Sequence, residues 1–392
     1  MTVLATSILI SLIKIAAVLA IVFTLAPLLV WAERRQSAVI QDRVGPVRAS
    51  IRIAGREIRL AGLLHPLADT LKMMWKEDFV PPRADKFLHS LAPIAALVPA
   101  LMTLAVLPFG NLLHLEAWNQ VVAEVEPGHW CVLGNAGQAC VAELDFARGI
   151  PLQIASLDVG ILFLFAIAGT GVVGAAIGGY ASDNKYSLLG GLRAAGQMVS
   201  YEVVLGLTLV GCFMIYGSLR LEEMVRWQRD HAWGIVVQPV AALLYLTAAI
   251  AETKRIPFDV PEGESEIVGG YFTEYSGMKF GMFFMGEFIE VVVLAALATS
   301  LFFGGWSLPF LDESGIHLFG FRLWLPHLAV VALQFGVFMA KLLVLIWLQL
   351  MLRWSLPRFR YDQIMRLCWR YLLPLTFANI VLTALAILLW PS

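Results

Sequence analysis

Long apolar stretches alternate with shorter polar connections along most of this chain. A helix needs about 20 predominantly apolar residues to cross the hydrocarbon core of a bilayer. The sequence offers eight such stretches, at residues 8–31, 88–109, 157–180, 194–217, 234–251, 279–302, 325–350 and 371–390. The pattern predicts an all-α integral membrane protein with about eight transmembrane helices, forming a single polytopic domain over residues 1–392.

Composition supports this prediction. The chain is 59% hydrophobic and 15% charged, whereas a soluble domain is about 45–50% apolar and about 25% charged. The first apolar stretch holds one internal charge, Lys14, and ends at Glu33-Arg34-Arg35 without a small-residue cleavage site. We therefore expect a retained helix there and not a signal peptide. The third stretch is rich in glycine, which favours close helix packing.

The distribution of basic residues predicts an orientation. Lysines and arginines crowd the connection 33–87 and also favour 252–278 and 351–370, whereas 110–156 holds only Arg148. Basic residues favour the cytoplasmic side of a membrane. We expect 33–87 and 252–278 to be cytoplasmic, and 110–156 and both termini to face the other side. The connection 218–233, with three arginines, blurs the pattern.

An acidic connection lies between the fifth and sixth stretches. Pro257 and Pro261 forbid a continuous helix there. Such irregular backbone is tolerated at membrane depth only when it is buried in protein or lines a wet cavity. Carboxylates crowded in a low dielectric cannot all ionise, so protons become shared, as a proton relay requires. The acidic residues of this segment are Glu252, Asp259, Glu262, Glu264, Glu266 and Glu274. The alternative is a solvated acidic loop on the cytoplasmic face.

Three further carboxylates lie inside predicted membrane helices. Glu202 falls well within the fourth stretch, and Glu287 and Glu290 within the sixth. Carboxylates are costly inside a membrane, which makes these residues functional candidates. The alternative is a helix-end carboxylate at the lipid headgroups. Arg193 precedes Glu202 by nine residues, so we expect it to influence the acidic cluster from the boundary without pairing directly with Glu202.

The connection 33–87 also predicts an amphipathic surface helix. Apolar residues recur at helical spacing from Leu63 to Trp75, with Lys72 and Lys76 four residues apart. This helix is either an interfacial anchor or the wall of a cavity faced by His65 and Asp69.

The cysteines and short motifs exclude several kinds of site. The sequence contains no Rossmann, Walker or zincin motif. None of its four cysteines has an iron–sulfur spacing. We expect no metal, flavin, haem or iron–sulfur cluster on this chain. Cys131 and Cys140 lie in the connection assigned to the non-cytoplasmic side, so we predict a disulfide between them, two unpaired thiols being the alternative.

Several of these runs together resemble the membrane subunit of respiratory complex I that lies at the quinone site, which is called the H subunit in the bacterial enzyme. The matching stretches are ERRQSAVIQDRVGP, GLLHPLADTLKMMWKEDFVPPRADKFLHSLAPI, ASDNKYSLLGGLRAAGQMVSYEV, AETKRIPFDVPEGESEIVGGYFTEYSG, LFFGGW and RFRYDQIMRLCW. They cover nearly the whole chain apart from the termini and residues 47–61 and 111–150. Several long blocks in the right order make the resemblance highly specific.

The resemblance implies a quinone-tunnel and coupling subunit of a proton-pumping NADH:quinone oxidoreductase. Its substrate would be ubiquinone or menaquinone, with FMN and iron–sulfur clusters only on partner subunits. The expected partners are the hydrophilic-arm subunits, the small and antiporter-like membrane subunits and lipid, but no nucleic acid. The expected location is the bacterial inner membrane, with both termini periplasmic.

The resemblance also assigns residues. The proton-coupling set is Glu202, Glu252, Asp259, Glu262, Glu264, Glu266, Glu274, Glu287, Arg193 and Arg255. The quinone-tunnel set is Glu33, Arg34, Arg43, His65 and Asp69. The chain departs from the family at His65, where the family has glutamine, and by an insertion of about nine residues after GPVR.

Other function classes remain as alternatives. The chain could be the equivalent subunit of a membrane-bound hydrogenase or an F420-dependent complex, a stand-alone ion transporter, or a passive anchor. A transporter would favour internal repeats, which we do not find. A passive anchor leaves Glu202 and the acidic connection without a role.

Overall fold

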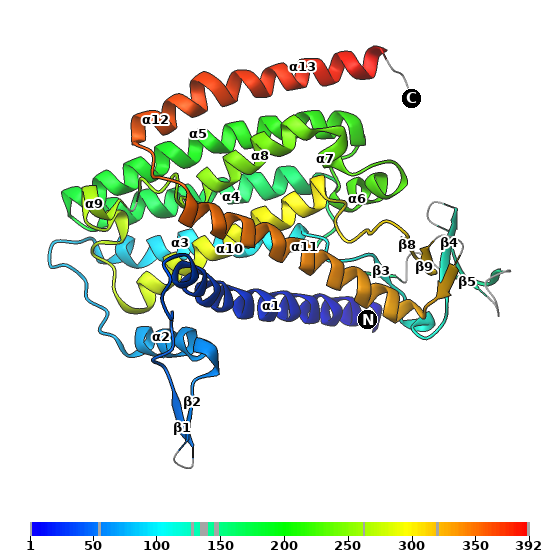
Figure 1. Cartoon of the computed structure of the whole chain (residues 1–392), viewed down its shortest axis with the longest axis horizontal. Coiled ribbons are helices and arrows are strands. Elements are labelled where there is room, and N and C mark those ends of the chain that lie inside the picture. Colours follow the sequence, from blue (N-terminus) through cyan, green and yellow to red (C-terminus); the bar gives the residue numbers. More distant parts are fainter. Residues whose placement is uncertain are drawn as a thin grey trace.

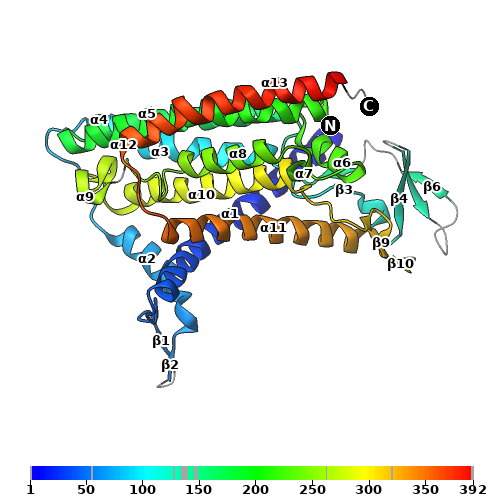
Figure 2. The ribbon, with the colours of Figure 1, turned by 45° about the horizontal axis from the view of Figure 1, so that its top comes forward.

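The body of the molecule is a bundle of long helices lying side by side (Figures 1 and 2). The structure is a computed structural model that describes residues 2–53, 56–126, 129–133, 140–144, 149–261, 263–318 and 321–389. Among these residues, seven helices are long and apolar enough to cross a membrane, and α8 (Pro239–Glu252) is a shorter apolar helix. The predicted all-α membrane fold, with a short fifth span, is confirmed.

The long helices are α1 (Thr2–Ile40), α3 (Lys86–Thr103), α4 (Gly160–Ala181), α5 (Lys185–Tyr216), α10 (Gly277–Phe302), α11 (His327–Ser355) and α13 (Leu373–Leu389). The last of these is continuous with α12 (Tyr361–Arg366) through a π-helical segment, Leu367–Leu372. Shorter helices are α2 (Leu64–Trp75), α6 (Leu221–Asp230), α7 (Gly234–Val237) and α9 (Glu264–Ile267). The predicted amphipathic surface helix is therefore present as α2.

Several helices extend beyond their apolar stretches. Helix α5 begins at Lys185 and not near residue 194, because Asn184 caps its N-terminus by accepting a hydrogen bond from the Tyr186 N–H at 2.9 Å. The predicted connection 181–193 is thus mostly helical. Helix α1 likewise continues through Glu33-Arg34-Arg35 to Ile40. Hydropathy marks the part of a helix that faces lipid, and polar turns extend these helices past it.

Short antiparallel strands occupy the connections. They are the hairpin β1 (Ile51–Ile53) and β2 (Arg56–Ile58), the pair β3 (Leu112–Leu113) and β7 (Ile150–Pro151), and two three-stranded sheets. One sheet contains β4 (Val122–Glu126), β5 (His129–Leu133) and β6 (Cys140–Leu144); the other contains β8 (Leu311–Asp312), β9 (Gly315–Leu318) and β10 (Phe321–Trp324). The hydropathy pattern predicts none of these strands.

The cysteines divide into two kinds. Cys131, on β5, is disulfide-bonded, whereas Cys212 and Cys368 are free and buried within helices. The side chain of Cys140, the predicted partner, lies outside the described side chains. The backbone of Cys140 is on β6, directly beside β5.

Glycines allow α4 to pack closely between α3 and α5. A Cβ at Gly174 would lie 2.5 Å from the backbone nitrogen of Ala96 on α3. On the other face, a Cβ at Gly179 would lie 3.0 Å from the Cα of Gly191 on α5. The close packing predicted from the glycine-rich stretch is confirmed.

Helix α10 lies at the centre of the bundle. Of the most apolar 18 residues of α10, 67% are buried inside the molecule, whereas the corresponding share for α1 is 11%. The α10 side chains Glu287 and Phe288 are buried. The Glu287 carboxylate is therefore surrounded by protein.

Both termini lie at the same end of the bundle, opposite α9 (Figures 1 and 2). The strands β4–β6 lie at the end with the termini. The predicted topology places 110–156 and both termini on one side, and this arrangement agrees with it. Which side of the membrane this is stays a prediction.

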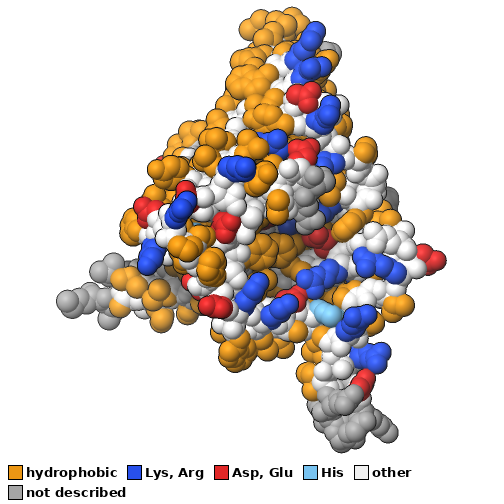
Figure 3. All heavy atoms as spheres, turned by 90° about the vertical axis from the view of Figure 1, so that its left-hand side faces the viewer, with side chains coloured by type: hydrophobic (Ala, Val, Ile, Leu, Met, Phe, Trp, Pro, Cys, Tyr) orange, Lys and Arg blue, Asp and Glu red, His pale blue; other side chains and the backbone are white. Residues whose placement is uncertain are grey.

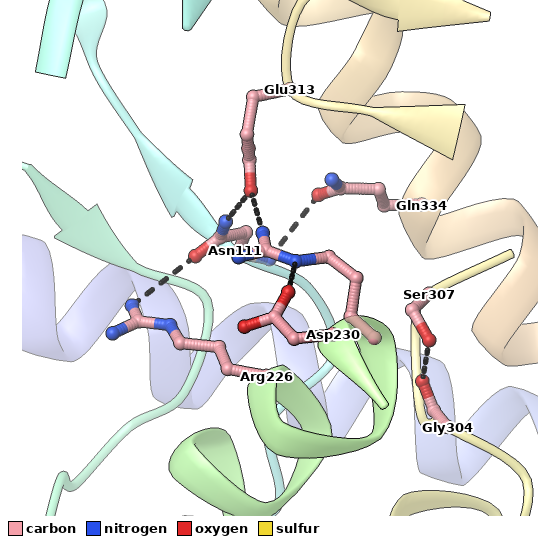
Figure 4. Close-up of polar contacts among 8 residues, drawn as sticks. Asn111, Arg226, Asp230, Gly304, Ser307, Glu313 and Gln334 are labelled. Carbon is pink, nitrogen blue, oxygen red and sulfur yellow. Dashed lines mark hydrogen bonds and ion pairs between the residues drawn. The ribbon is translucent and has the colours of Figure 1, made fainter. Parts of the chain in front are cut away.

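A polar cluster closes the bundle at the end with the termini (Figure 4). Glu313, before β9, accepts hydrogen bonds from Asn111 Nδ2 at 2.6 Å and from Arg229 Nη1 on α6 at 2.7 Å. The Asn111 N–H donates to Gln334 Oε1 on α11 at 3.4 Å, and Arg226 donates to Asn111 Oδ1 at 3.5 Å. The cluster ties three connections to α11, which makes it a structural clamp.

Candidate functional site

Three carboxylates from three helices meet at a small, partly open cavity within the bundle. Glu202 of α5, Glu252 at the end of α8 and Glu290 of α10 line a cavity of about 40 Å³. Its other lining residues are mostly apolar. A cavity of this size has room for water. Glu252 Oε2 and Glu290 Oε2 are buried and have no hydrogen-bond partner among the described residues.

A glycine makes room for the Glu202 carboxylate. A Cβ at Gly169 of α4 would lie 2.6 Å from Glu202 Oε1 and 3.1 Å from Oε2. A Cβ at Gly171 would lie 3.8 Å from Glu290 Oε1, an ordinary contact. The glycines of α4 thus serve helix packing and, at Gly169, the position of a carboxylate.

A buried lysine and tyrosine lie beside this cavity. Lys254 Nζ donates to Tyr271 Oη at 3.3 Å, and that hydroxyl donates to Glu287 Oε1 at 2.9 Å. Lys254 Nζ is also 3.7 Å from Glu287 Oε1 and 4.0 Å from Glu290 Oε2. Neither Lys254 nor Tyr271 is among the residues that the sequence singles out. The position of Lys254 two residues after Glu252, before the prolyl break, is the signal that could have identified it.

Glu33 links the expected quinone-tunnel residues to the expected proton-coupling residues. Its carboxylate pairs with Arg255 of the acidic connection at 2.8 Å and with Arg353 of α11 at 2.6 Å. The Arg255 guanidinium lies 4.0 Å from the centre of the Phe288 ring. The Glu33 and Arg255 side chains are only 13% and 9% exposed, so this is a largely desolvated ion pair. Arg353 is a second residue that the sequence does not single out.

Arg34 and Asp69 meet between α1 and α2. Arg34 Nη1 lies 2.6 Å from Asp69 Oδ2 in a half-exposed ion pair. Both residues line a cavity of about 70 Å³ whose walls include Phe284 and Phe288 of α10. The two residues also line an adjoining cleft of about 530 Å³. The cleft is further lined by Lys72, Met73, Lys76, Gly269, Phe272, Thr273, Tyr275, Ser276, Gly277, Phe280, Phe284 and Arg353.

The other two residues of the expected quinone-tunnel set hold the chain after α1. His65 Nε2 accepts hydrogen bonds from the N–H groups of Arg48 and Ala49, each at 3.1 Å. Arg43 Nη2 donates to Ser37 Oγ at 3.2 Å. In the described part of the chain, neither lines the cavity of Arg34 and Asp69. Both order the segment that follows α1.

The acidic connection is anchored to α5 and to the segment after α11. Gln197 Nε2 donates to the carbonyls of Ala251 and Phe258, each at 2.8 Å. The Asp259 carbonyl accepts a hydrogen bond from Arg358. These contacts explain how an irregular segment stays ordered beside membrane helices.

Arg193 contacts the acidic connection directly. Arg193 Nη1 lies 2.8 Å from Glu266 Oε2, with side-chain exposures of 23% and 46%. As the sequence suggested, Arg193 does not pair with Glu202, but it has a carboxylate partner of its own. Glu262 and the side chain of Glu264 lie outside the described part of the chain.

Glu274 lies apart from the cavity of Glu202, Glu252 and Glu290. Its Oε1 accepts a hydrogen bond from Asn184 Nδ2 at 2.7 Å, and it lines an open cleft of about 760 Å³. Burial raises the pKa of the neighbouring Tyr275, which therefore keeps its proton. Because Glu274 lines this open cleft and not the cavity of Glu202, the two carboxylates belong to different sites.

The end of the molecule that carries α2 and α9 is rich in charge. Lysine, arginine, aspartate and glutamate side chains gather there among apolar ones (Figure 3). Half-exposed ion pairs at this end include Arg34–Asp69 and Arg193–Glu266. This end therefore presents a surface of mixed charged and apolar side chains.

Comparisons with known proteins agree on one family. The NADH dehydrogenase family matches residues 13–384. The chain is similar to the first NADH-quinone oxidoreductase H subunit of Geobacter metallireducens, at 43% identity over 99% of this chain and 100% of that protein. It is 45% identical to the second NADH-quinone oxidoreductase H subunit of Geobacter sulfurreducens, over 94% of each chain. It is also 38% identical to NADH-quinone oxidoreductase subunit 8 of Rhodothermus marinus, over 93% of each chain. The chain therefore belongs to the NADH dehydrogenase family and is a complex I subunit of the H type.

Proposed function

We propose that this chain forms the quinone tunnel of a proton-pumping NADH:quinone oxidoreductase and couples quinone reduction to proton movement. The observation that carries the proposal is the small, mostly apolar cavity at which Glu202, Glu252 and Glu290 meet. A passive anchor has no need of three carboxylates among apolar side chains inside a helix bundle, where each unpaired charge is costly. The relatives named above are all NADH-quinone oxidoreductase subunits, which disfavours the hydrogenase, F420-dependent and transporter alternatives.

The quinone side of the proposal rests on the cavity of Arg34 and Asp69. It combines one ion pair with an apolar wall that includes Met73, Phe284 and Phe288. Ligand sites of this kind use apolar walls for area and a few polar groups for orientation. A quinone has an apolar tail and a polar headgroup, so its chemistry fits both parts.

A continuous set of contacts links the two cavities. Phe288 lies in the wall of the Arg34 cavity, and its ring is covered by Arg255. Arg255 holds Glu33 and directly follows Lys254, which lies near Glu287 and Glu290. A change of charge on a bound quinone acts on these ion pairs at short range. Because crowded carboxylates share protons, such a change alters which of them is protonated.

The proposal includes partners and a location. The electrons come from FMN and iron–sulfur clusters on hydrophilic-arm subunits, which dock on the charged end shown in Figure 3. Other membrane subunits and lipid cover the apolar flanks. The chain lies in a bacterial inner membrane with both termini and β4–β6 in the periplasm. The bonded Cys131 on β5 supports that orientation, since disulfides persist in the periplasm.

Asp69→Ala in the assembled complex tests the quinone part. We expect quinone reduction to fall while electron transfer to an artificial acceptor upstream continues, because only the quinone cavity is changed. Asp158→Ala, which removes an 83% exposed carboxylate paired with Arg220, is the control and should leave both activities unchanged. Normal quinone reduction in Asp69→Ala, or an equal loss of both activities, would contradict the assignment.

Glu202→Gln tests the coupling part. It keeps the shape of the side chain but removes its negative charge. We expect quinone reduction and proton pumping to fall together in an assembled complex. Glu222→Gln, whose carboxylate accepts a hydrogen bond from Ser156 at 2.6 Å, is the matched control. Normal turnover and a normal proton-to-electron ratio in Glu202→Gln would refute the proposal.

A further inference from the structure

Lys254 is a buried amine among carboxylates. Its side chain is 5% exposed. Glu287 and Glu290 of α10 face it at 3.7 and 4.0 Å, and the charge of Glu252 on its own segment also acts on it. The neighbouring Arg255 also acts on Glu290. A buried lysine can act as a general base, so this environment suits an amine that gives up and regains a proton.

The hydrogen bonds around Lys254 run in one direction. The Lys254 ammonium donates to the Tyr271 hydroxyl at 3.3 Å, and that hydroxyl donates to Glu287 Oε1 at 2.9 Å. Tyr271 is 1% exposed, and its ring packs edge-on against Phe283. The ring is thereby held in place, and its hydroxyl bridges a donor and an acceptor. Two aligned hydrogen bonds of this kind form a path for a proton.

The other side of Lys254 meets the carboxylate cavity. Glu290 Oε2 lies 4.0 Å from Lys254 Nζ and has no hydrogen bond among the described residues. Glu290 lines the cavity together with Glu202 and Glu252. Glu287 is not among the residues that line it. Lys254 and Tyr271 therefore stand between the three cavity carboxylates and Glu287, which is buried.

We propose that Lys254 and Tyr271 form the proton connection between the carboxylate cavity and Glu287. This inference rests on the proposed function, since it assigns the link within the same proton path. In the step, an N–H bond of Lys254 breaks as a new O–H bond forms on Tyr271. The original O–H bond of Tyr271 breaks as an O–H bond forms on Glu287. Lys254 is left as a neutral amine and takes the carboxylic proton of a protonated Glu290, whose Oε2 lies 4.0 Å away and must move closer for the transfer. The net result is the transfer of one proton from Glu290 to Glu287.

The low dielectric makes such a step accessible. A buried ion pair is penalised by desolvation of both charges. Transfer of the proton along these hydrogen bonds converts the Lys254–Glu287 ion pair into two neutral groups and removes that penalty. The charged and neutral forms are thereby brought closer in free energy than they would be in water. A proton can then pass in either direction as nearby charges change.

Tyr271→Phe tests the connection because it removes a single hydroxyl and keeps the packed ring. We expect roughly 100-fold slower quinone reduction and a larger solvent deuterium isotope effect, in line with the loss of an acid–base group. The pH dependence of turnover should change as well. Tyr245→Phe is the matched control, because it removes an equally buried hydroxyl that donates to the Leu294 carbonyl at 2.9 Å. Its turnover and isotope effect should match those of the unchanged complex. Lys254→Met and Lys254→Arg should both resemble Tyr271→Phe, because methionine carries no transferable proton and a guanidinium keeps its own.

Glu202→Gln separates this inference from the proposed function. A slow Glu202→Gln complex beside a normal Tyr271→Phe complex would overturn the connection and leave the proposed function standing. A normal Glu202→Gln complex would overturn the proposed function itself. Loss of assembled complex in Tyr271→Phe, but not in Tyr245→Phe, would show that Tyr271 has a structural role and would overturn the connection.

Discussion

Gly169→Ala moves the Glu202 carboxylate without changing any charged residue. The new Cβ would lie 2.6 Å from Glu202 Oε1, whereas ordinary contacts begin at 3.4 Å. The carboxylate must therefore move by about 0.8 Å or more, or rotate away from α4. The three atoms nearest to the new Cβ all belong to the Glu202 carboxyl group. The flexible end of one side chain can yield, so the helices need not separate.

Stability and activity should respond in opposite ways. Alanine in place of a helical glycine favours the helix by roughly 0.5–1 kcal/mol, so the assembled complex should be as heat-stable as the parent or slightly more so. A displacement of about 1 Å at a reacting group can cost roughly 100-fold in rate. We expect quinone reduction coupled to pumping to fall by about ten-fold to 100-fold, as measured in proteoliposomes with a pH-sensitive dye.

Two glycines provide matched controls. Gly206 lies one helical turn after Glu202 on α5, and Gly336 lies on α11; a Cβ at either position meets nothing within 4 Å. Gly206→Ala and Gly336→Ala should keep normal turnover and pumping. Normal activity in Gly169→Ala would show that the position of the Glu202 carboxylate does not matter, and the reasoning about the cavity would fail.

Other predictions concern packing, the ion pairs and the disulfide. Gly174→Ala should prevent assembly, because its Cβ would lie 2.5 Å from backbone of Ala96; a normal amount of complex on a native gel would contradict this. Glu33→Gln should lower quinone reduction and the midpoint of thermal unfolding, because it leaves Arg255 largely buried without its carboxylate, a change that costs about 3–5 kcal/mol in fully buried pairs and less here; an unchanged midpoint would argue against it. Cys131→Ser should lower the free energy of unfolding by about 2–3 kcal/mol without affecting turnover. Slower quinone reduction in the fully assembled complex would contradict a purely structural role.

The fold could largely be predicted from the sequence because lipid imposes long apolar stretches on spanning helices. The glycine-rich stretch also indicated close packing, which Gly174 and Gly179 show. The polar ends of the helices were not predictable in the same way. Residues 185–193 are helical because Asn184 caps α5, and hydropathy carries no information about a cap. The small sheets escaped prediction because their strands are mostly two to five residues long.

The site was predictable as a set of residue types but not as a set of contacts. Carboxylates beside a prolyl break indicated proton chemistry, and Glu202 and Glu252 do share one cavity. The sequence grouped Glu33 with the quinone residues alone, yet it holds Arg255 of the acidic connection. Residues more than 200 positions apart in the sequence meet there, and no local pattern encodes such a meeting. Lys254 was missed because a single lysine among charged neighbours looks like part of a solvated loop until its burial is known.

Difference infrared spectroscopy of the assembled complex tests the central claim most directly. Spectra taken before and after quinone reduction report the protonation of buried carboxyl groups through their C=O stretching band. We predict a carboxyl signal that is lost or shifted in Glu202→Gln and retained in Glu222→Gln, whose carboxylate lies outside the cavity beside Ser156. An identical carboxyl signal in the complex with unchanged sequence and in Glu202→Gln would show that quinone reduction does not change the protonation of Glu202, and the proposed coupling would be wrong.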